Sequence, residues 1–215
     1  MSIVTNLTTQ EINKIQIDEG VCIVDYGEAS ERPLLPCRGG GEFNATATIR
    51  DIEYDGRNGK TAGTQAIEEQ AATLKVTVIN MSQQNLMLAM PFCRMFDANG
   101  NPITTSTSAT PATLKNPKMG IVPTAAYAKN ITMFAKLVDG TYKKITIYKP
   151  MHEGGITAKA TQKAEGELAL EFNAHYDTDA LDGDLWQIDE IDSFTLRQVQ
   201  QSAGGGSSSS SGTTG

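Results

Sequence analysis

The stretch Glu42–Asp55, EFNATATIRDIEYD, alternates apolar and polar residues along most of its length. Its apolar members, which would point to one side of an extended chain, are Phe43, Ala45, Ala47 and Ile49. A second stretch, Glu167–Asp177 (ELALEFNAHYD), repeats the pattern with Leu168, Leu170, Phe172, Ala174 and Tyr176. A period of two indicates a strand with one face buried. We therefore predict a mainly β fold, a sandwich or barrel-like sheet to which both stretches contribute strands.

Other segments carry related patterns. Val21–Tyr26 is apolar almost throughout, which is typical of a strand buried on both faces. Ala71–Asn80 places Leu74, Val76 and Val78 on one face. An Asp-Gly pair, the strongest short hairpin signal, separates two further stretches. The remaining predicted strands are Tyr127–Leu137, Thr141–Lys149 and Ala158–Tyr176, and Trp186–Leu196 is open between strand and helix.

Two helices are expected. Thr9 is a candidate N-cap for a short helix over Gln10–Ile17, with Ile12 and Ile15 on one face. Gln83–Phe92 contains good helix formers and ends against Pro91, so we predict one helix flanking the sheet there.

Two segments are predicted to be loops. Gly27–Gly41 contains two prolines and ends in three consecutive glycines, which would let the backbone turn sharply or pass close to another chain. Gly56–Gln70 is polar and would join Glu42–Asp55 to Ala71–Asn80 as a hairpin with a long loop. Hairpin loops usually have 2–5 residues, so a loop of this length is usually functional or ordered by a partner.

Length and composition suggest one domain with extended arms. The chain has 215 residues, and its last stretch is GGGSSSSSGTTG. Such a tail cannot bury enough apolar surface to become ordered on its own. We divide the chain into an N-terminal arm with a short helix (1–20), a β domain (21–200) and a flexible tail (201–215).

The net charge of −7 and the pI near 4.9 argue against a nucleic-acid-gripping protein, because phosphate binding needs clustered basic residues. An acidic surface is better suited to a channel along which nucleic acid slides without sticking. The N-terminus shows no signal peptide and no apolar run approaches the ~18 residues of a membrane span. We expect a soluble protein made in the cytoplasm, with its three cysteines, Cys22, Cys37 and Cys93, as reduced thiols.

The chain offers weak chemical motifs. Gly59-Lys60-Thr61 ends a phosphate-loop pattern, but Tyr54 stands where the first glycine is needed. Asp177–Asp184 is close to a calcium loop, with spacing one residue off and Ile188 in place of the bidentate Glu. The histidines, His152 and His175, lack zinc spacing, and no nucleophile elbow is present. We expect no catalytic residues, metal or cofactor.

Several segments of the chain resemble those of a known protein family. The run GGGEFNATATIRDIEYDGRNGK (39–60) with the strand AATLKVTVIN (71–80) resembles the tail tube, or major tail, proteins of tailed bacteriophages. YKKITIYKPMHEGG (142–155) and ELALEFNAHYD (167–177) extend the similarity, which covers about Gly39 to Asp177. The resemblance implies a tail tube fold and stacked homo-hexameric rings whose inner strands pair across subunits. DNA would pass through the lumen without specific binding.

The resemblance also implies sites and partners. A long hairpin loop reaches the neighbouring ring in this family, and by position its residues here would include Gly56, Arg57, Lys60, Glu68 and Glu69. Partners would be further copies of the chain and other tail proteins (tape measure, tail terminator and distal tail), with no membrane. The protein would reside in the virion tail, after assembly in the host cytoplasm.

Two alternatives remain. One is a tube protein of a contractile injection or secretion system, which passes protein instead of DNA. The other is a calcium- or carbohydrate-binding β-sandwich module that uses Asp177–Asp184 and Trp186. The module would be a monomer with a cation-dependent melting temperature, whereas tube proteins would form rings or tubes at high concentration.

Overall fold

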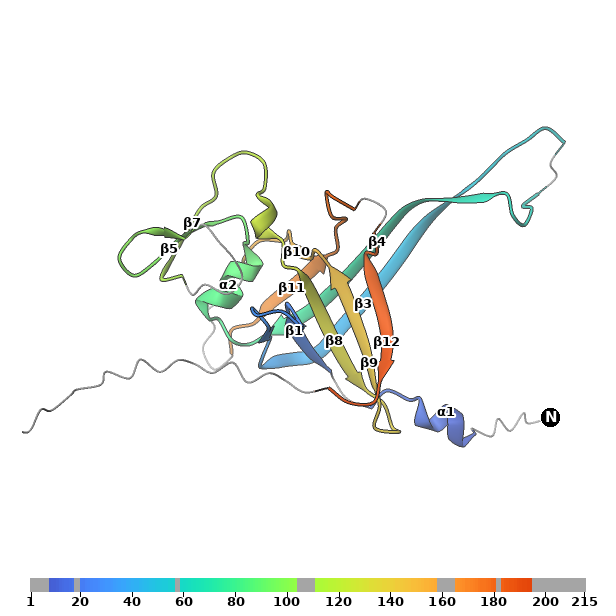
Figure 1. Cartoon of the computed structure of the whole chain (residues 1–215), viewed down its shortest axis with the longest axis horizontal. Helices are drawn as coiled ribbons and strands as arrows, with labels where there is room; N and C mark the ends of the chain where they lie inside the picture. The colour runs from blue at the N-terminus through green and yellow to red at the C-terminus, as the bar shows by residue number, and fades with distance from the viewer. Residues whose placement is uncertain are drawn as a thin grey trace, which may run out of the picture.

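The computed structural model describes residues 8–17, 20–56, 59–103, 111–157, 165–180 and 183–194. These residues form three antiparallel sheets with little helix, and 45% strand against 9% helix confirms the predicted mainly β class (Figure 1). The N-terminal residues 1–7, Arg57 and the tail 201–215 lie outside the described residues.

The first sheet has five strands in the order β12-β9-β8-β1-β2. β8 and β9 form the predicted hairpin around Asp139-Gly140, and Gly140 takes the positive φ (88°) that its turn requires. The segment Trp186–Leu196, left open between strand and helix, begins with strand β12. The bounds are β1 Val21–Val24, β2 Arg32–Pro33, β8 Asn130–Lys136, β9 Tyr142–Tyr148 and β12 Trp186–Ile191.

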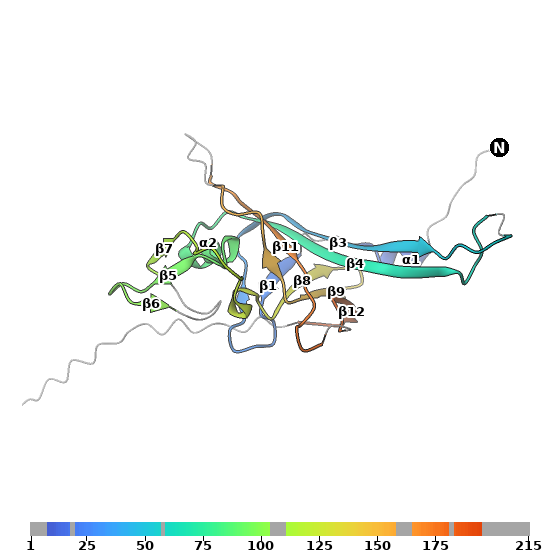
Figure 2. The ribbon, with the colours of Figure 1, turned by 90° about the horizontal axis from the view of Figure 1, so that it is seen from above.

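The second sheet has four strands in the order β10-β11-β4-β3. Its two long strands form one antiparallel hairpin, but β11 pairs with β4 only between Thr73 and Val78. The rest of the hairpin therefore projects beyond the sheet as a two-stranded arm, which Figures 1 and 2 both show. The bounds are β3 Cys37–Asp51, β4 Gln65–Val78, β10 Met151–His152 and β11 Leu168–Asn173.

A small third sheet, in the order β6-β5-β7, lies at the end of the molecule opposite the arm (Figures 1 and 2). The predicted flanking helix lies beside it and is capped by Ser82, whose side chain accepts from the Asn85 amide. The bounds are β5 Arg94–Phe96, β6 Pro102–Ile103, β7 Thr113–Lys115, α2 Gln83–Ala89, a 3-10 turn η1 Thr124–Ala126, and α1 Thr9–Asn13 near the N-terminus.

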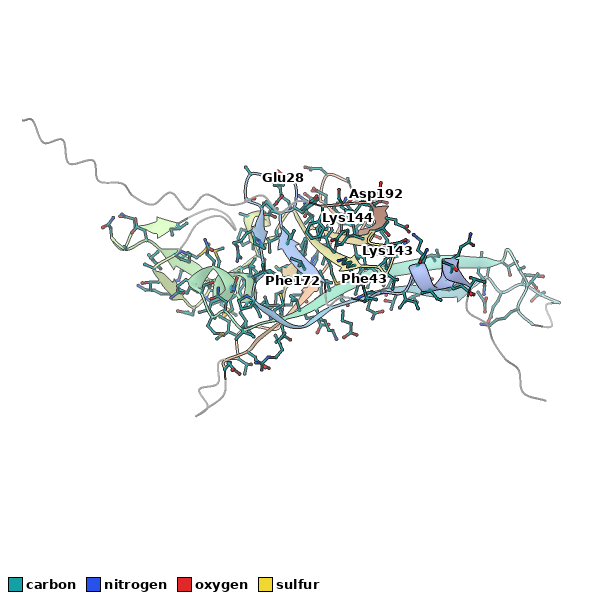
Figure 3. All side chains as sticks on the ribbon, turned by 90° about the horizontal axis from the view of Figure 1, so that it is seen from below. Glu28, Phe43, Lys143, Lys144, Phe172 and Asp192 are labelled. Atoms are coloured by element: carbon teal, nitrogen blue, oxygen red, sulfur yellow. The ribbon has the colours of Figure 1, made fainter. Side chains whose placement is uncertain are left out.

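The core lies between the first and second sheets. The alternation predicted for 71–80 is confirmed, whereas that predicted for 167–177 extends only through β11, because Ala174 is half-buried beyond the strand and Tyr176 is exposed. The buried apolar residues of the two strands are Leu74, Val76 and Val78 of β4 and Leu168, Leu170 and Phe172 of β11. They pack against the first sheet in one hydrophobic cluster. Figure 3 labels two of the aromatic rings in this layer, the buried Phe172 and the partly buried Phe43, which meets Trp186 of β12 edge-on.

Several sequence predictions were wrong in detail. The helix predicted over Gln83–Phe92 ends at Ala89, and the strand predicted over Ala158–Tyr176 begins at Leu168 and ends at Asn173, with 158–164 outside the described residues. Thr8, not Thr9, caps α1 through a capping box with Glu11, and the helix ends at Asn13 rather than Ile17. The segment Gly27–Gly41 is not simply a loop, since it contains β2 and the start of β3. The strand predicted over Val21–Tyr26 ends at Val24, because Asp25 turns the chain with a φ of 53°.

The glycine run closes a gap inside the molecule. Gly39 and Gly40 have positive φ, and the register of β3 on β4 shifts between Arg38 and Gly41. This bulge brings Gly41 so close to the first sheet that a Cβ there would lie 2.5 Å from Met133 Sδ and 3.2 Å from Cys22 Sγ. The backbone that the glycines allow to approach is thus that of β3 on its own core.

Candidate assembly surfaces

The arm consists of residues 45–56 and 59–72, in which β3 and β4 have no other strand partner. Directly paired residues of antiparallel strands share a face, so the pairing defines two faces on this ribbon. Phe43 pairs with Leu74 at the edge of the core, and the same face continues outward along the arm. Ala45 pairs with Ala72, which is still buried in the core cluster. Beyond this pair the face is mostly apolar and exposed, with Ala47 opposite Gln70 and Ile49 opposite Ile67.

A bulge keeps the apolar face continuous. Thr48 pairs with Glu69 but Ile49 pairs with Ile67, which leaves Glu68 as the extra residue. Without it Ile67 would fall opposite Arg50 on the polar face. With it, two large apolar side chains lie opposite each other, and they are 57% and 60% exposed. Such a pair at the end of a projecting ribbon is the pattern expected of a surface that another chain covers.

The other face of the second sheet is polar, and its cations are paired. Arg50 Nε donates to Glu68, and Lys75 Nζ lies 3.5 Å from a Glu171 oxygen across β4 and β11. Arg38 bonds to Glu167 and, at 3.0 Å, to Glu165, and these carboxylates raise the pKa of its guanidinium. Asn and Thr side chains fill the positions between them: Asn44, Thr46, Thr48, Thr73, Thr77 and Asn173. This face therefore offers few unneutralised positive charges.

The two edges of the second sheet differ. β3 forms an outer edge over its whole length and, in the described part of the chain, pairs with β4 alone. At the opposite edge β10 pairs with only two residues of β11. The buried ring of His152 occupies the next position along this edge and contacts the backbone of Glu171. Its Nδ1 lies 2.9 Å from the Glu171 carbonyl oxygen and 3.0 Å from the Glu171 amide, while Nε2 meets the Gly155 oxygen at 3.0 Å. A long edge strand is a template for pairing with another chain, and the register of β3 is regular from Gly41 to Thr48.

The five loop residues named from the sequence fall in two places. Gly56 and Lys60 belong to the connection at the arm's tip, and Arg57 lies outside the described residues. Gly56 has a φ of 87°, and Lys60 Nζ lies 3.7 Å from Asp51 Oδ2. Glu68 and Glu69 belong to β4, so the prediction of a loop over Gly56–Gln70 was wrong from Gln65 onward. That segment is polar because the arm exposes both its faces, and a polar strand cannot be told from a loop by composition.

The acidic turn does not assemble a metal site among the described residues. Asp177 binds Lys149 at 2.8 Å, and this contact lowers the pKa of the carboxyl group. No group of three potential ligands is found in the described residues, although Asp182 is not among them. His175 is engaged elsewhere, with Nδ1 3.1 Å from the Lys149 carbonyl and Nε2 3.2 Å from Glu153.

The cysteines are free, and two of the three are buried. Burial raises the pKa of Cys22 to about 12 and also raises the pKa of Cys37 and Cys93. The thiols are therefore protonated at neutral pH and poor nucleophiles.

The sequence reading missed a hollow of about 340 Å³ at the other end of the molecule. We call it the β5 hollow; its apolar lining includes Phe92, Met95, Phe96, Ile103, Met119 and Ile121. Met119 and Ile121 are fully exposed at its rim. The available signal was the group of three apolar residues between Pro117 and Pro123, which no strand or helix pattern explains: Met119, Ile121 and Val122.

No helix within the described ranges is long and apolar enough to cross a membrane. No protein-family model matches the chain, and no curated protein is significantly similar to it. Functional arguments therefore depend on the surfaces described above.

Proposed function

We propose that this protein is the structural subunit of a bacteriophage tail tube, which self-assembles into hexameric rings that stack around a channel for the genome. The observation that carries the proposal is the arm, a two-stranded ribbon whose apolar face beyond Ala72 is exposed in the described part of the chain. Ile49 and Ile67 lie opposite each other on that face. A monomeric protein gains nothing from such a projection, whereas a subunit gains a contact with its neighbour.

The open edge of β3 supports the same function. Edge-to-edge pairing between the second sheets of adjacent subunits would join β3 of one copy to the β10–β11 edge of the next. The two edges are different, so the interface is head-to-tail and must close into a ring or continue as a filament. Ring closure would remove the free edges, which otherwise promote aggregation.

In such a ring the polar face of the second sheet would line the lumen. Its three cations, Arg38, Arg50 and Lys75, are each held by a carboxylate on the same face. Phosphate groups would therefore displace existing ion pairs to bind, which disfavours retention of DNA. A channel of this kind passes the genome without gripping it, and the protein would act in the virion tail.

The test is negative-stain electron microscopy of the purified, concentrated protein, with and without added calcium. Rings or hollow tubes in both samples are the expected result. A calcium-dependent monomer would point to the binding-module alternative instead. A protein that stays monomeric at every concentration, and also fails to add to tubes of purified phage tails, would contradict the proposal.

A further inference from the structure

The two ends of the molecule carry surfaces of opposite charge. At the arm end, the described residues 45–56 and 59–72 contain five carboxylates and two basic side chains. At the opposite end, residues 90–103 and 111–126 contain three basic side chains, Arg94, Lys115 and Lys118, and one carboxylate, Asp97. Both ends also expose large apolar side chains, so each combines charge with apolar surface.

The arm tip concentrates its features in Asp51–Asp55, DIEYD. Ile52 and Tyr54 are 46% and 53% exposed, and carboxylates alternate with them along the chain. An exposed tyrosine flanked by apolar surface is among the commonest anchors of protein interfaces. This segment thus has an anchor and a negative rim.

The β5 hollow has the matching features. Its lining is apolar, with Phe96, Met119 and Ile121 among the contributors, and Arg94 and Lys118 belong to its wall. Lys115 lies beside it, with Nζ 4.5 Å from the centre of the Phe96 ring. A volume of about 340 Å³ is within the usual range of binding pockets.

An arm cannot reach the hollow of its own chain. Figures 1 and 2 place β5 and β7 at one end of the long axis and the tip of the β3–β4 hairpin at the other. Only a second copy can bring the two surfaces together. Because the surfaces differ, the contact repeats from copy to copy in a head-to-tail manner.

We propose that Ile52 and Tyr54 of one copy's arm enter the β5 hollow of the next copy. The neighbouring carboxylates, Glu53 and Asp55, face the basic residues Lys115 and Lys118. This inference rests on the proposed self-assembly and names the pair of surfaces that carries it. Apolar burial of the tyrosine supplies affinity, while the opposed charges orient the arm and raise the association rate.

Charge reversal with rescue tests the proposal. The arm variant is E53K/D55K, the hollow variant is K115E/K118E, and the matched control is D179K/D184K in the exposed acidic turn. Sedimentation velocity of the full-length chain at low and high salt measures self-association. We expect each of the first two variants to associate at least about tenfold more weakly than the wild type, and the control to associate like it. Wild-type association should also weaken with salt.

Mixing the two variants gives the decisive result. The basic arm of one then meets the acidic hollow of the other, and the acidic arm of the second meets the basic hollow of the first. The equimolar mixture should regain association within a few-fold of wild type. Two folded variants that fail together as they fail alone would overturn the proposal, as would variants that associate normally.

The apolar part of the contact has its own test. Tyr54→Ala should weaken association about tenfold, whereas Tyr176→Ala, at a tyrosine of similar exposure outside both surfaces, should not. Equal effects of the two changes would contradict the docking of the arm. Tubes that form regardless of these substitutions would leave the proposed function standing and remove this surface pair. If the mixed variants regain association but no ring or tube is seen by electron microscopy, this surface pair would stand and the proposed function would fail.

Discussion

The inner and outer halves of the β3–β4 hairpin share one sequence pattern but have different surroundings. Near the sheet, Phe43 pairs with Leu74, and the apolar face is covered by β1, β8 and β9. Farther out, Ile49 pairs with Ile67 on the same face, and both side chains are exposed. Alternation therefore reports which face of a strand is apolar, but whether that face is buried depends on how far the opposing sheet extends.

The difference separates stability from assembly. A side chain of the inner half contributes to the folding of the monomer, because its removal leaves a cavity in a packed core. A side chain of the outer half contributes nothing comparable until a second chain covers it. Substitutions along one ribbon should thus divide into two classes, and the boundary should fall at the end of β11 pairing.

The largest effect is expected for the inner half. Leu74→Thr should lower the free energy of unfolding by about 2–5 kcal/mol, since it empties part of a fully buried site and adds a buried hydroxyl. The matched change Ile67→Thr on the arm should alter it by less than about 0.5 kcal/mol. Urea denaturation followed by circular dichroism measures both. Similar losses would show that the arm is covered within the monomer.

A second prediction concerns the outer half. The double variant I49T/I67T should fold normally but self-associate about ten- to a hundredfold more weakly, because each interface anchor contributes about 1.4 kcal/mol or more. The control, T46A/T48A, changes the polar face of the same β3 segment and should leave association unchanged. Light scattering against concentration gives both values. If both double variants weakened association equally, the apolar face of the arm would not be the specific contact surface.

Much of the fold could be predicted from the sequence, but the arm could not. The period of two located β4 and β11, and Asp139-Gly140 located the β8–β9 hairpin, because these signals are local. Gln65–Gln70 was assigned to a loop because Ile67 is its one large apolar residue and the bulge at Glu68 interrupts the period of two. The bulge at Glu68 and the approach of Gly41 to Met133 depend on the partner strand and the opposing sheet.

The candidate surfaces follow the same division. The family resemblance implied that Glu68 and Glu69 are contact residues, but the sequence could not place them on a ribbon with an apolar face. The β5 hollow was missed entirely, since it combines segments that are separated along the chain, from Pro91 to Ala126. Proximity in space of short, irregular segments leaves no periodic trace in the sequence.

The smallest effect of a substitution on stability is expected where a segment is held by exposed charges rather than by burial. The stretch that follows α1 binds the β8–β9 turn through Val138 N to Ile15 O (3.0 Å) and through Lys14 Nζ to Asp139 Oδ2 (2.8 Å). Hydrogen bonds from Lys14 and then Thr141 lower the pKa of Asp139 to about 2.

The sign of this pH dependence is fixed. The folded carboxyl group binds its proton less readily than an unfolded aspartate, which titrates near pH 3.9. The stabilisation is therefore fully present above about pH 3.9 and is lost as the pH falls through about 2. Because the pair is exposed to solvent, the loss should loosen only the N-terminal segment and leave the core folded.

Nuclear magnetic resonance can follow this titration at the side chain of Asp139 and at the Val138 amide. We expect one shared midpoint near pH 2, and we expect D139N to give at pH 5 the Val138 signal that the wild type approaches only below this midpoint. D184N, at an exposed carboxylate outside this contact, should change neither signal. A midpoint near the ordinary value for aspartate would mean that Lys14 does not hold the segment, and that backbone hydrogen bonds such as that of Val138 dock it alone.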